Sequence, residues 1–373
     1  MKIINFIINP HLVFENDENS FIVINKSINQ RIKTTQKFYK FLKKINTLNT
    51  FTIPNLKSSY NLSDSVIRYL LNYLFIIPHG NEIFARGFHI FPENFNKNRK
   101  KLLGDILYAT SPYNVIIGLQ IDTFKDTYLS TRTSPNEIRA QLNKFDNLSY
   151  FDIGNILYFP HSETLADLGE RVYFITKILI EKRHFPIFLG GDHSLTYYTA
   201  NALLREVEEL GIIHFDAHHD LYQDINSLNP LNHANVFYHL AEDSRIKSIT
   251  QIGVRTPTPL YRNEKITTFD IAQCNVDIIR NTIKKLSKTI KYYISFDIDV
   301  VDPKFAPDVV APIPNGLLPE RCFELLKLIV EELPVIGMDM VEVCQSQEKM
   351  NKTSFLAAQL IQKVMQYKVK ALF

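Results

Sequence analysis

Residues 211–220 read Gly-Ile-Ile-His-Phe-Asp-Ala-His-His-Asp, a short apolar run followed at once by acidic and histidine side chains. The same arrangement recurs at residues 186–193, Pro-Ile-Phe-Leu-Gly-Gly-Asp-His, and at residues 292–299, Tyr-Tyr-Ile-Ser-Phe-Asp-Ile-Asp. Each apolar run predicts a buried strand. Because open α/β sheets bind ligands at the carboxyl ends of their strands, the polar residues are predicted to meet at one edge of a sheet.

The polar residues behind these strands predict a site for two metal ions. Residues spaced by two project to the same face of an extended chain, so one strand end delivers several ligands. Four carboxylates and two imidazoles exceed the needs of one divalent ion, and oxygen-rich ligation favours Mn2+ over zinc. A single Asp-x-Asp is more often a turn or a helix cap, but three such segments beside a core would be costly without a cation. The candidate ligands are His193, Asp216, His218, Asp220, Asp297 and Asp299.

From residue 111 to residue 373 the chain resembles the ureohydrolase family, the arginases and agmatinases. The resemblance rests on the segments above and on further motifs in the family's order, at residues 115–118, 133–139, 152–154 and 341–343. It implies a three-layer α/β/α domain with a mostly parallel sheet, and a centre of two manganese ions per subunit. By this resemblance, Asp216 and Asp297 would bind both ions. His193 and Asp220 would bind only the first ion, and His218 and Asp299 only the second.

The resemblance also implies hydrolysis of a guanidinium group, whose carbon is a poor electrophile and needs a strong nucleophile. Glu342 is placed to pair with the planar guanidinium, and His233 holds the place of a proton-shuttling histidine. The plain alternatives are a surface ion pair for Glu342 and a backbone-bonded loop residue for His233, since the family usually has glycine at Ala234. Asp302 is expected to shape a turn before a proline or to orient ligands.

The chain departs from arginases where they hold the amino and carboxylate groups of a free amino acid. Tyr222 and Asn229 stand where arginases have short polar side chains, and the loop at residues 253–258 has no acidic residue. The stretch after the Asp-Pro pair also differs, reading Pro-Asp-Val-Val-Ala-Pro at residues 307–312. These departures point away from free arginine.

The first 90 residues contain 11 Lys and Arg against 5 Asp and Glu, whereas the remainder contains 31 against 34. Apolar runs at residues 12–14 and 21–24 predict a hairpin, followed by helices over residues 36–44 and from an N-cap at Ser63. In pattern alone this order resembles winged-helix modules that bind leader peptides of ribosomally made natural products. The predicted organisation is a small α+β winged-helix-like, leader-binding domain (1–90), a linker (91–110) and an arginase-like catalytic domain (111–373).

A catalytic domain without contacts for a free amino acid, joined to a peptide-binding module, favours a peptide arginase of ribosomal peptide biosynthesis. This enzyme would convert peptidyl arginine to peptidyl ornithine and urea, and a bound leader would raise the local concentration of the substrate peptide. The alternative is a ureohydrolase of a free small guanidino compound, such as agmatine, a guanidino acid or arginine. A third interpretation, a non-catalytic nucleic-acid-binding regulator, is disfavoured because every candidate ligand is present.

Composition sets the remaining expectations. Hydrophobic residues make up 45% and charged residues 22% of the chain, which is typical of a globular protein. Cys274, Cys322 and Cys344 have no paired spacing, so neither a disulfide framework nor a zinc knuckle is predicted. No signal-peptide pattern or membrane-length apolar run is found, which predicts a cytoplasmic enzyme with no membrane or nucleic-acid partner. By resemblance, a homo-oligomer is expected.

Overall fold

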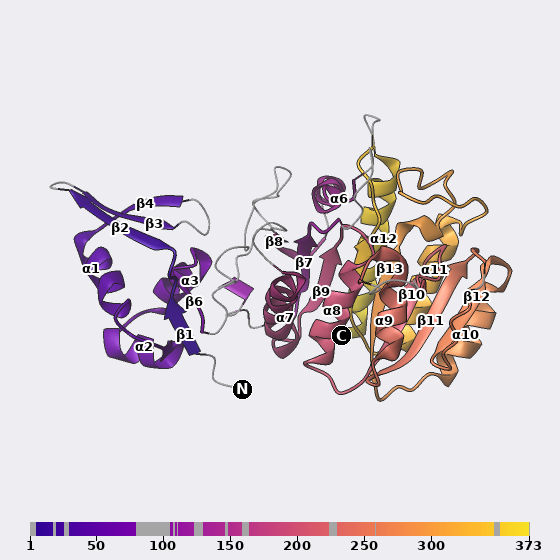
Figure 1. Ribbon diagram of the computed structural model, residues 1–373, viewed down its shortest axis with the longest axis horizontal. Coiled ribbons are helices and arrows are strands. Elements are labelled where there is room, and N and C mark those ends of the chain that lie inside the picture. The colour runs from indigo at the N-terminus through magenta and orange to yellow at the C-terminus, as the bar shows by residue number, and fades with distance from the viewer. Residues whose placement is uncertain are drawn as a thin grey trace.

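The computed structural model describes residues 5–17, 20–25, 30–79, 105–106, 109, 111–122, 130–145, 148–158, 164–223, 230–257, 259–346 and 351–372. The described residues form a small α+β unit at the N-terminal end and a larger α/β unit that follows it (Figure 1). The larger unit carries the predicted ligands, so its sheet decides where they lie.

The larger unit is built on one sheet of eight strands, in the order β12-β11-β10-β13-β14-β9-β7-β8. Every neighbouring pair of strands is parallel. Strands such as β9 and β10 are buried at every position, as expected for a parallel sheet covered on both faces. The strands are β7 (Asn114–Leu119), β8 (Phe151–Ile156), β9 (Phe185–Leu189), β10 (Leu210–Phe215), β11 (Ile246–Val254), β12 (Ile266–Asp270), β13 (Lys291–Asp297) and β14 (Val335–Val341).

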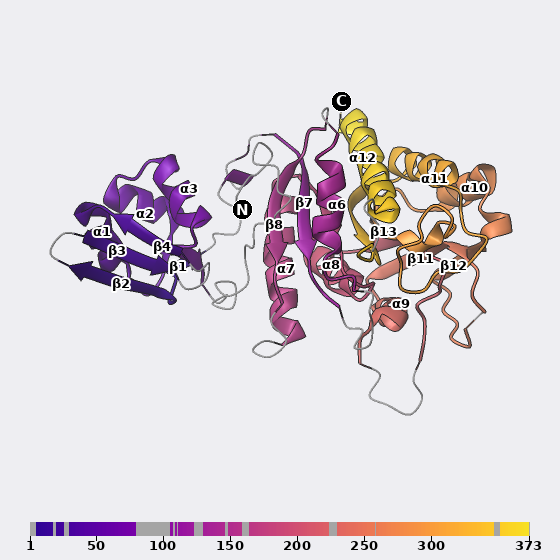
Figure 2. The same ribbon diagram turned by 90° about the horizontal axis from the view of Figure 1, so that it is seen from above.

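Helices cover both faces of this sheet (Figure 2), and the predicted three-layer α/β/α fold is therefore confirmed. One face packs against α6 (Ser134–Leu142), α10 (Val276–Lys285), α11 (Pro319–Glu332) and α12 (Lys352–Leu372). The opposite face packs against α7 (Leu165–Glu181), α8 (Leu195–Leu204) and α9 (Val236–Glu242). Three short 3-10 helices complete the unit: η1 (His233–Asn235), η2 (Ile271–Gln273) and η3 (Ile298–Val300).

The N-terminal unit contains two small antiparallel sheets and three helices with a hydrophobic core of their own. The predicted hairpin and both predicted helices are present, and the Ser63 side chain caps the second of them by accepting from the Val66 N–H. The elements are β1 (Asn5–Ile8), β2 (Leu12–Asp17), β3 (Ser20–Asn25), β4 (Gln30–Thr34), α1 (Gln36–Ile45), β5 (Phe51–Thr52), α2 (Ile53–Tyr60), α3 (Asp64–Asn72) and β6 (Ile76–Pro78). Leader binding stays a prediction, and nearly all of the predicted linker, residues 91–110, lies outside the described residues.

Two predictions from composition are addressed by the structure. All three cysteines are buried and free, in agreement with the absence of paired spacing. None of the helices among the described residues is both long and apolar enough to cross a bilayer.

A buried ion pair links α6 to β8 and explains why two of the sequence motifs occur together. Arg139 is 1% exposed, and its guanidinium donates to both carboxylate oxygens of Asp152 at 2.7 and 3.1 Å. The same guanidinium donates to the Asn155 side chain and to the carbonyl oxygen of Gly154. The pair therefore satisfies a charge that burial would otherwise make costly.

Replacement of Asp152 by alanine is expected to lower the free energy of unfolding by about 3–5 kcal/mol, because it leaves the Arg139 charge buried without a partner. Equilibrium urea denaturation measures this change. The matched control is Glu170→Ala, which breaks the exposed 2.6 Å pair with Arg205 and is expected to cost less than about 1 kcal/mol. Equal losses in the two variants would contradict the assignment.

Candidate metal centre

Four neighbouring strands bring the predicted site residues to one edge of the sheet. The strands β10, β13, β14 and β9 are adjacent in the sheet and parallel, so their carboxyl ends lie side by side. His193 follows β9, Asp216 follows β10, and Glu342 follows β14. Asp297 ends β13 and Asp299 lies in the short helix η3 directly after it. The topology therefore assembles residues that are more than one hundred positions apart in the chain.

His193 faces three of the predicted carboxylate ligands. Its Nδ1 atom lies 3.0 Å from a carboxylate oxygen of Asp216, 3.0 Å from one of Asp220 and 3.2 Å from one of Asp297. This nitrogen is fully buried, and none of the described residues makes a well-aligned hydrogen bond with it. Convergence of three carboxylate oxygens on one unbonded imidazole nitrogen is the arrangement of ligands around a cation.

His218 forms the second half of the cluster. Its Nδ1 atom lies 2.9 Å from a carboxylate oxygen of Asp299 and 3.2 Å from Oδ1 of Asp216. Asp216 therefore directs Oδ1 towards His218 and Oδ2 towards His193, which is the geometry of a bridging carboxylate. Each of the two predicted sites contains one imidazole and shares Asp216.

The structure brings together all six predicted ligands, but in two sets of unequal composition. The compact sets of possible ligand atoms are His193, His214, Asp216 and Asp220 in one, and Asp216, His218 and Asp299 in the other. Asp297 belongs to neither compact set, although its Oδ2 atom lies 3.2 Å from Nδ1 of His193. Its Oδ1 atom accepts the backbone N–H of Asp299. Its predicted bridging role therefore has less geometric support than that of Asp216.

The charges of the cluster are those of a site that needs a cation. Burial, together with Asp299 and Asp216, raises the pKa of Asp297 well above its usual value. Burial and the Asp216 charge raise the pKa of Asp220 to about 7. Burial opposes protonation of His218, but Asp216 and Asp299 outweigh it and raise its pKa to about 11. The cluster alone therefore retains protons, and the donors present fit two divalent ions that would replace them.

Residues behind the predicted ligands hold them in place, and the sequence motifs did not identify these residues. His214 is fully buried, and its Nε2 atom lies 2.8 Å from Oδ2 of Asp216. Burial lowers the pKa of His214 to about 4, so the ring is neutral. The Ser295 hydroxyl lies 2.9 Å from Nε2 of His193. His214 in β10 and Ser295 in β13 each lie two positions before a predicted ligand. That position suggests that they support the ligands, but it does not show which atom each one contacts.

Arg255 fixes the backbone of the segment that carries Asp299. Its guanidinium donates to the carbonyl oxygens of Asp299, Val300, Gly253 and Ile313. Because these four carbonyls belong to three separate segments, the arginine joins the end of β11 to η3 and to the loop at residue 313. Sequence reasoning noted this arginine only as part of a loop without acidic residues.

Glu342 is buried and held in a left-handed backbone conformation with φ of 62°. Its Oε1 atom accepts the backbone N–H of His193 at 2.7 Å, and its own N–H donates to the carbonyl of Gly191. Burial, with a contribution from Asp192, raises the pKa of Glu342 well above its usual value. The surface ion pair considered for Glu342 is therefore wrong, because the side chain lies inside the site.

His233 lies in η1, half-buried and within electrostatic reach of the cluster. Burial lowers the pKa of His233; the Asp192 charge raises it and His193 lowers it further. The imidazole is therefore neutral at neutral pH. Tyr222 is 61% exposed, whereas Asn229 lies outside the described residues. Asp302 accepts the N–H groups of Lys304 and Gly316, which agrees with its expected role in shaping a turn.

Comparison with known proteins places the larger unit in a family. The model of the Arginase family matches residues 113–366. A curated agmatinase of Proteus mirabilis is 27% identical over 293 residues, covering 74% of this chain and 90% of that protein. An agmatinase of Neisseria gonorrhoeae is 31% identical over 219 residues, covering 57% of this chain and 68% of that protein.

Solved structures of similar proteins share the fold. A hypothetical agmatinase from Burkholderia thailandensis superposes with a TM-score of 0.61 at 24% identity, covering 70% of this chain and 88% of that one. The agmatine ureohydrolase of Thermoplasma volcanium gives a TM-score of 0.59 at 25% identity, covering 70% and 91%.

Replacement of Asp216 by asparagine is expected to reduce bound manganese from about two ions per chain to fewer than one, because this carboxylate faces both halves of the cluster. Metal analysis after dialysis of the loaded protein measures the change. Asp302→Asn is the control and should keep the full metal content, since Asp302 accepts the backbone N–H groups of Lys304 and Gly316 and belongs to neither compact set of ligands. Equal metal content in both variants would exclude Asp216 as the shared ligand.

Proposed function

This chain belongs to the arginase family and is a ureohydrolase, and from that premise we propose that it hydrolyses a free small guanidino compound to urea and an amine. The observation that carries the proposal is the pairing of His193 and His218 with separate carboxylates around a shared Asp216. The family depends on two metal ions, and this pairing provides a place for two.

The relatives favour a free substrate over the peptidyl arginine preferred from sequence alone. Proteins that match up to 74% of the chain are named agmatinases, so agmatine is the first candidate. Agmatine has no α-carboxylate, which agrees with the absence of arginase-like contacts at Tyr222 and in the loop at residues 253–257. The missing contacts therefore support loss of amino-acid recognition without requiring a peptide.

The proposed cofactor is a pair of manganese ions, because carboxylate oxygens outnumber nitrogens among the ligands. His193 and Asp220 would hold one ion, His218 and Asp299 the other, and Asp216 both, with Asp297 close to the first. Bound there, the ions would supply hydroxide at neutral pH and offset the buried negative charge.

Glu342 is proposed to orient the guanidinium of the substrate. One of its carboxylate oxygens holds the backbone N–H of His193, and none of the hydrogen bonds recorded among the described residues uses Oε2. A planar guanidinium matches carboxylate geometry and would favour the ionised form of Glu342 that burial disfavours. The left-handed backbone at residue 342 costs free energy that the surroundings must supply, as is common at functional sites.

His233 is proposed to move protons between the site and solvent. Its imidazole is neutral at neutral pH because burial lowers its pKa, so it can accept a proton and pass it on. The departing amine needs a proton as the bond from carbon to nitrogen breaks, and this half-buried histidine would deliver it.

Peptidyl arginine is retained as a second candidate because of one observation. The N-terminal unit has a core of its own and precedes the region, residues 113–366, that matches the family. A leader-peptide partner, a homo-oligomeric state and a cytoplasmic location stay predictions.

Urea release by the full-length manganese-loaded protein separates the two candidates. We expect release from agmatine with kcat/KM at least about 100-fold higher than from an arginine peptide with blocked ends, a difference of about 2.7 kcal/mol in transition-state stabilisation. Release from the blocked peptide alone would overturn the proposal and establish the second candidate.

Replacement of His233 by alanine is expected to lower kcat by about 10²- to 10⁴-fold while leaving metal content unchanged, because the residue moves protons and does not hold metal. The control is His239→Ala, which removes a histidine on the adjoining helix α9. A loss of bound metal in His233→Ala, or an equal loss of kcat in both variants, would contradict the assigned role.

A further inference from the structure

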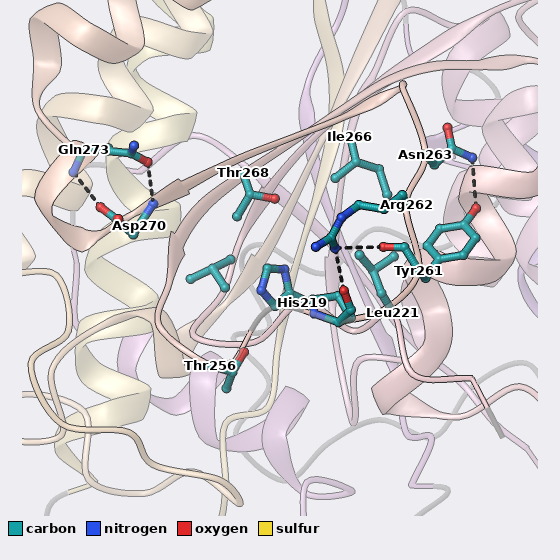
Figure 3. Close-up of a pocket in the computed structure, with 12 residues that line it drawn as sticks. His219, Leu221, Thr256, Tyr261, Arg262, Asn263, Ile266, Thr268, Asp270 and Gln273 are labelled. Carbon is teal, nitrogen blue, oxygen red and sulfur yellow. Dashed lines mark hydrogen bonds between the residues drawn. The ribbon is translucent and has the colours of Figure 1, made fainter.

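A pocket of about 450 Å³ lies along β12 and the carboxyl end of β11 (Figure 3), and two of its lining residues, His219 and Leu221, are neighbours in sequence of candidate metal ligands. Its walls come from the segment that carries His218 and Asp220, from the loop joining β11 to β12, and from β12 itself. Aliphatic side chains of Leu221, Val254 and Ile266 alternate with polar ones of Thr256 and Thr268. Small-molecule sites typically combine apolar walls with a few placed polar groups in this way.

The pocket is separate from the place where the guanidinium would react. His219 and Leu221 line the pocket, whereas their neighbours His218 and Asp220 face the metal cluster. None of the six candidate ligands is among the described residues that line the pocket. The segment from residue 218 to residue 221 therefore forms a wall between the two sites, with one set of side chains on each side.

The cationic side chain that lines the pocket, Arg262, is placed to bind an anion. Figure 3 shows the Arg262 guanidinium and the His219 ring facing the same space. Arg262 donates to the backbone carbonyls of Pro259 and Tyr261, and among the described residues none of the ion pairs includes it. The acidic residue of the lining, Asp270, already accepts from the backbone of η2. A carboxylate would complete the remaining donors of Arg262.

A chain of buried hydrogen bonds connects this pocket to the metal cluster. Gln251 is fully buried, and its Oε1 atom accepts from Thr268 at 2.9 Å and lies 3.2 Å from Nδ1 of His219. Its Nε2 atom donates to the carbonyl of His219 at 2.7 Å and lies 3.1 Å from Nδ1 of His214. His214 in turn contacts Asp216 at 2.8 Å. Thr268 and His219 of the pocket are thus connected to Asp216 through Gln251 and His214.

The amide also fixes the tautomer of His214. Because the Gln251 amide nitrogen can only donate, Nδ1 of His214 must accept, and its proton is on Nε2, where it is donated to Asp216. A ligand that moves Thr268 or His219 would therefore change the position of an amide that orients a candidate metal ligand.

We propose that this pocket is a second binding site, which takes a small aliphatic carboxylate and communicates its occupancy to the metal centre through Gln251 and His214. The proposal goes beyond the hydrolysis of a guanidino compound and holds for any substrate of the metal site. Binding and metal affinity are coupled reciprocally, so the carboxylate changes the manganese affinity by the same factor as manganese changes the carboxylate affinity.

Calorimetric titration of the full-length manganese-loaded protein with butyrate tests the site, with butyramide as a neutral probe of the same size. Butyrate is expected to bind at least about tenfold more tightly than butyramide, and Arg262→Gln should remove that preference. Arg280→Gln, which changes an exposed arginine of α10 outside the pocket lining, should keep it. The proposal would be overturned if butyrate and butyramide bound equally tightly, or if Arg262→Gln and Arg280→Gln had the same preference for butyrate.

The coupling is tested by measuring free Mn2+ by electron paramagnetic resonance with and without saturating butyrate. A change of about fivefold or more in the manganese dissociation constant is expected for the wild-type protein. Gln251→Met should still bind butyrate but lose this change, and Thr268→Val, which removes a single hydrogen bond to Gln251, should weaken it. An unchanged manganese dissociation constant in the wild-type protein would overturn the coupling.

Discussion

Four carboxylates and two imidazoles, most of them buried, lie together where neighbouring strands end, and much of the surrounding structure serves to hold that charge. Backbone N–H groups offset part of it, since Asp216, Asp297 and Asp299 each accept one from a residue nearby in sequence or across the sheet. Arg255 ties down the backbone of the segment that carries Asp299. What these groups leave uncompensated is the charge that two divalent ions would neutralise.

Two residues of the site have an unfavourable backbone conformation. Asp220 and Glu342 adopt left-handed conformations, with φ of 51° and 62°, which are uncommon for residues other than glycine. Each such residue costs about 1–3 kcal/mol and persists only where the surroundings enforce it. Gly191 lets the backbone before His193 pass close to the backbone of Ile121, because a side chain at residue 191 would collide with it. The backbone conformation of these residues therefore lowers the folding stability of the protein but fixes the position of the functional groups.

The sequence was sufficient for the buried strands and for the polar residues that gather at their ends, because both depend on local patterns: apolar runs, and polar residues spaced by two. It could not reveal how Gln251, His214 and Arg255 support those ligands, since each acts through contacts between segments that only the sheet order brings together. Nor did it predict β1, β4, β5 or α2 of the N-terminal unit, where short or distant elements pair. The preference for a peptide substrate rested on missing contacts and on the pattern of the N-terminal unit, and the missing contacts agree equally well with agmatine.

Anomalous X-ray scattering from crystals of the manganese-loaded protein tests the central claim most directly. Two manganese peaks separated by about 3.5–4 Å are expected, one beside His193 and one beside His218, with Asp216 in contact with both. A single peak, or peaks away from the carboxyl ends of β9, β10 and β13, would contradict the account.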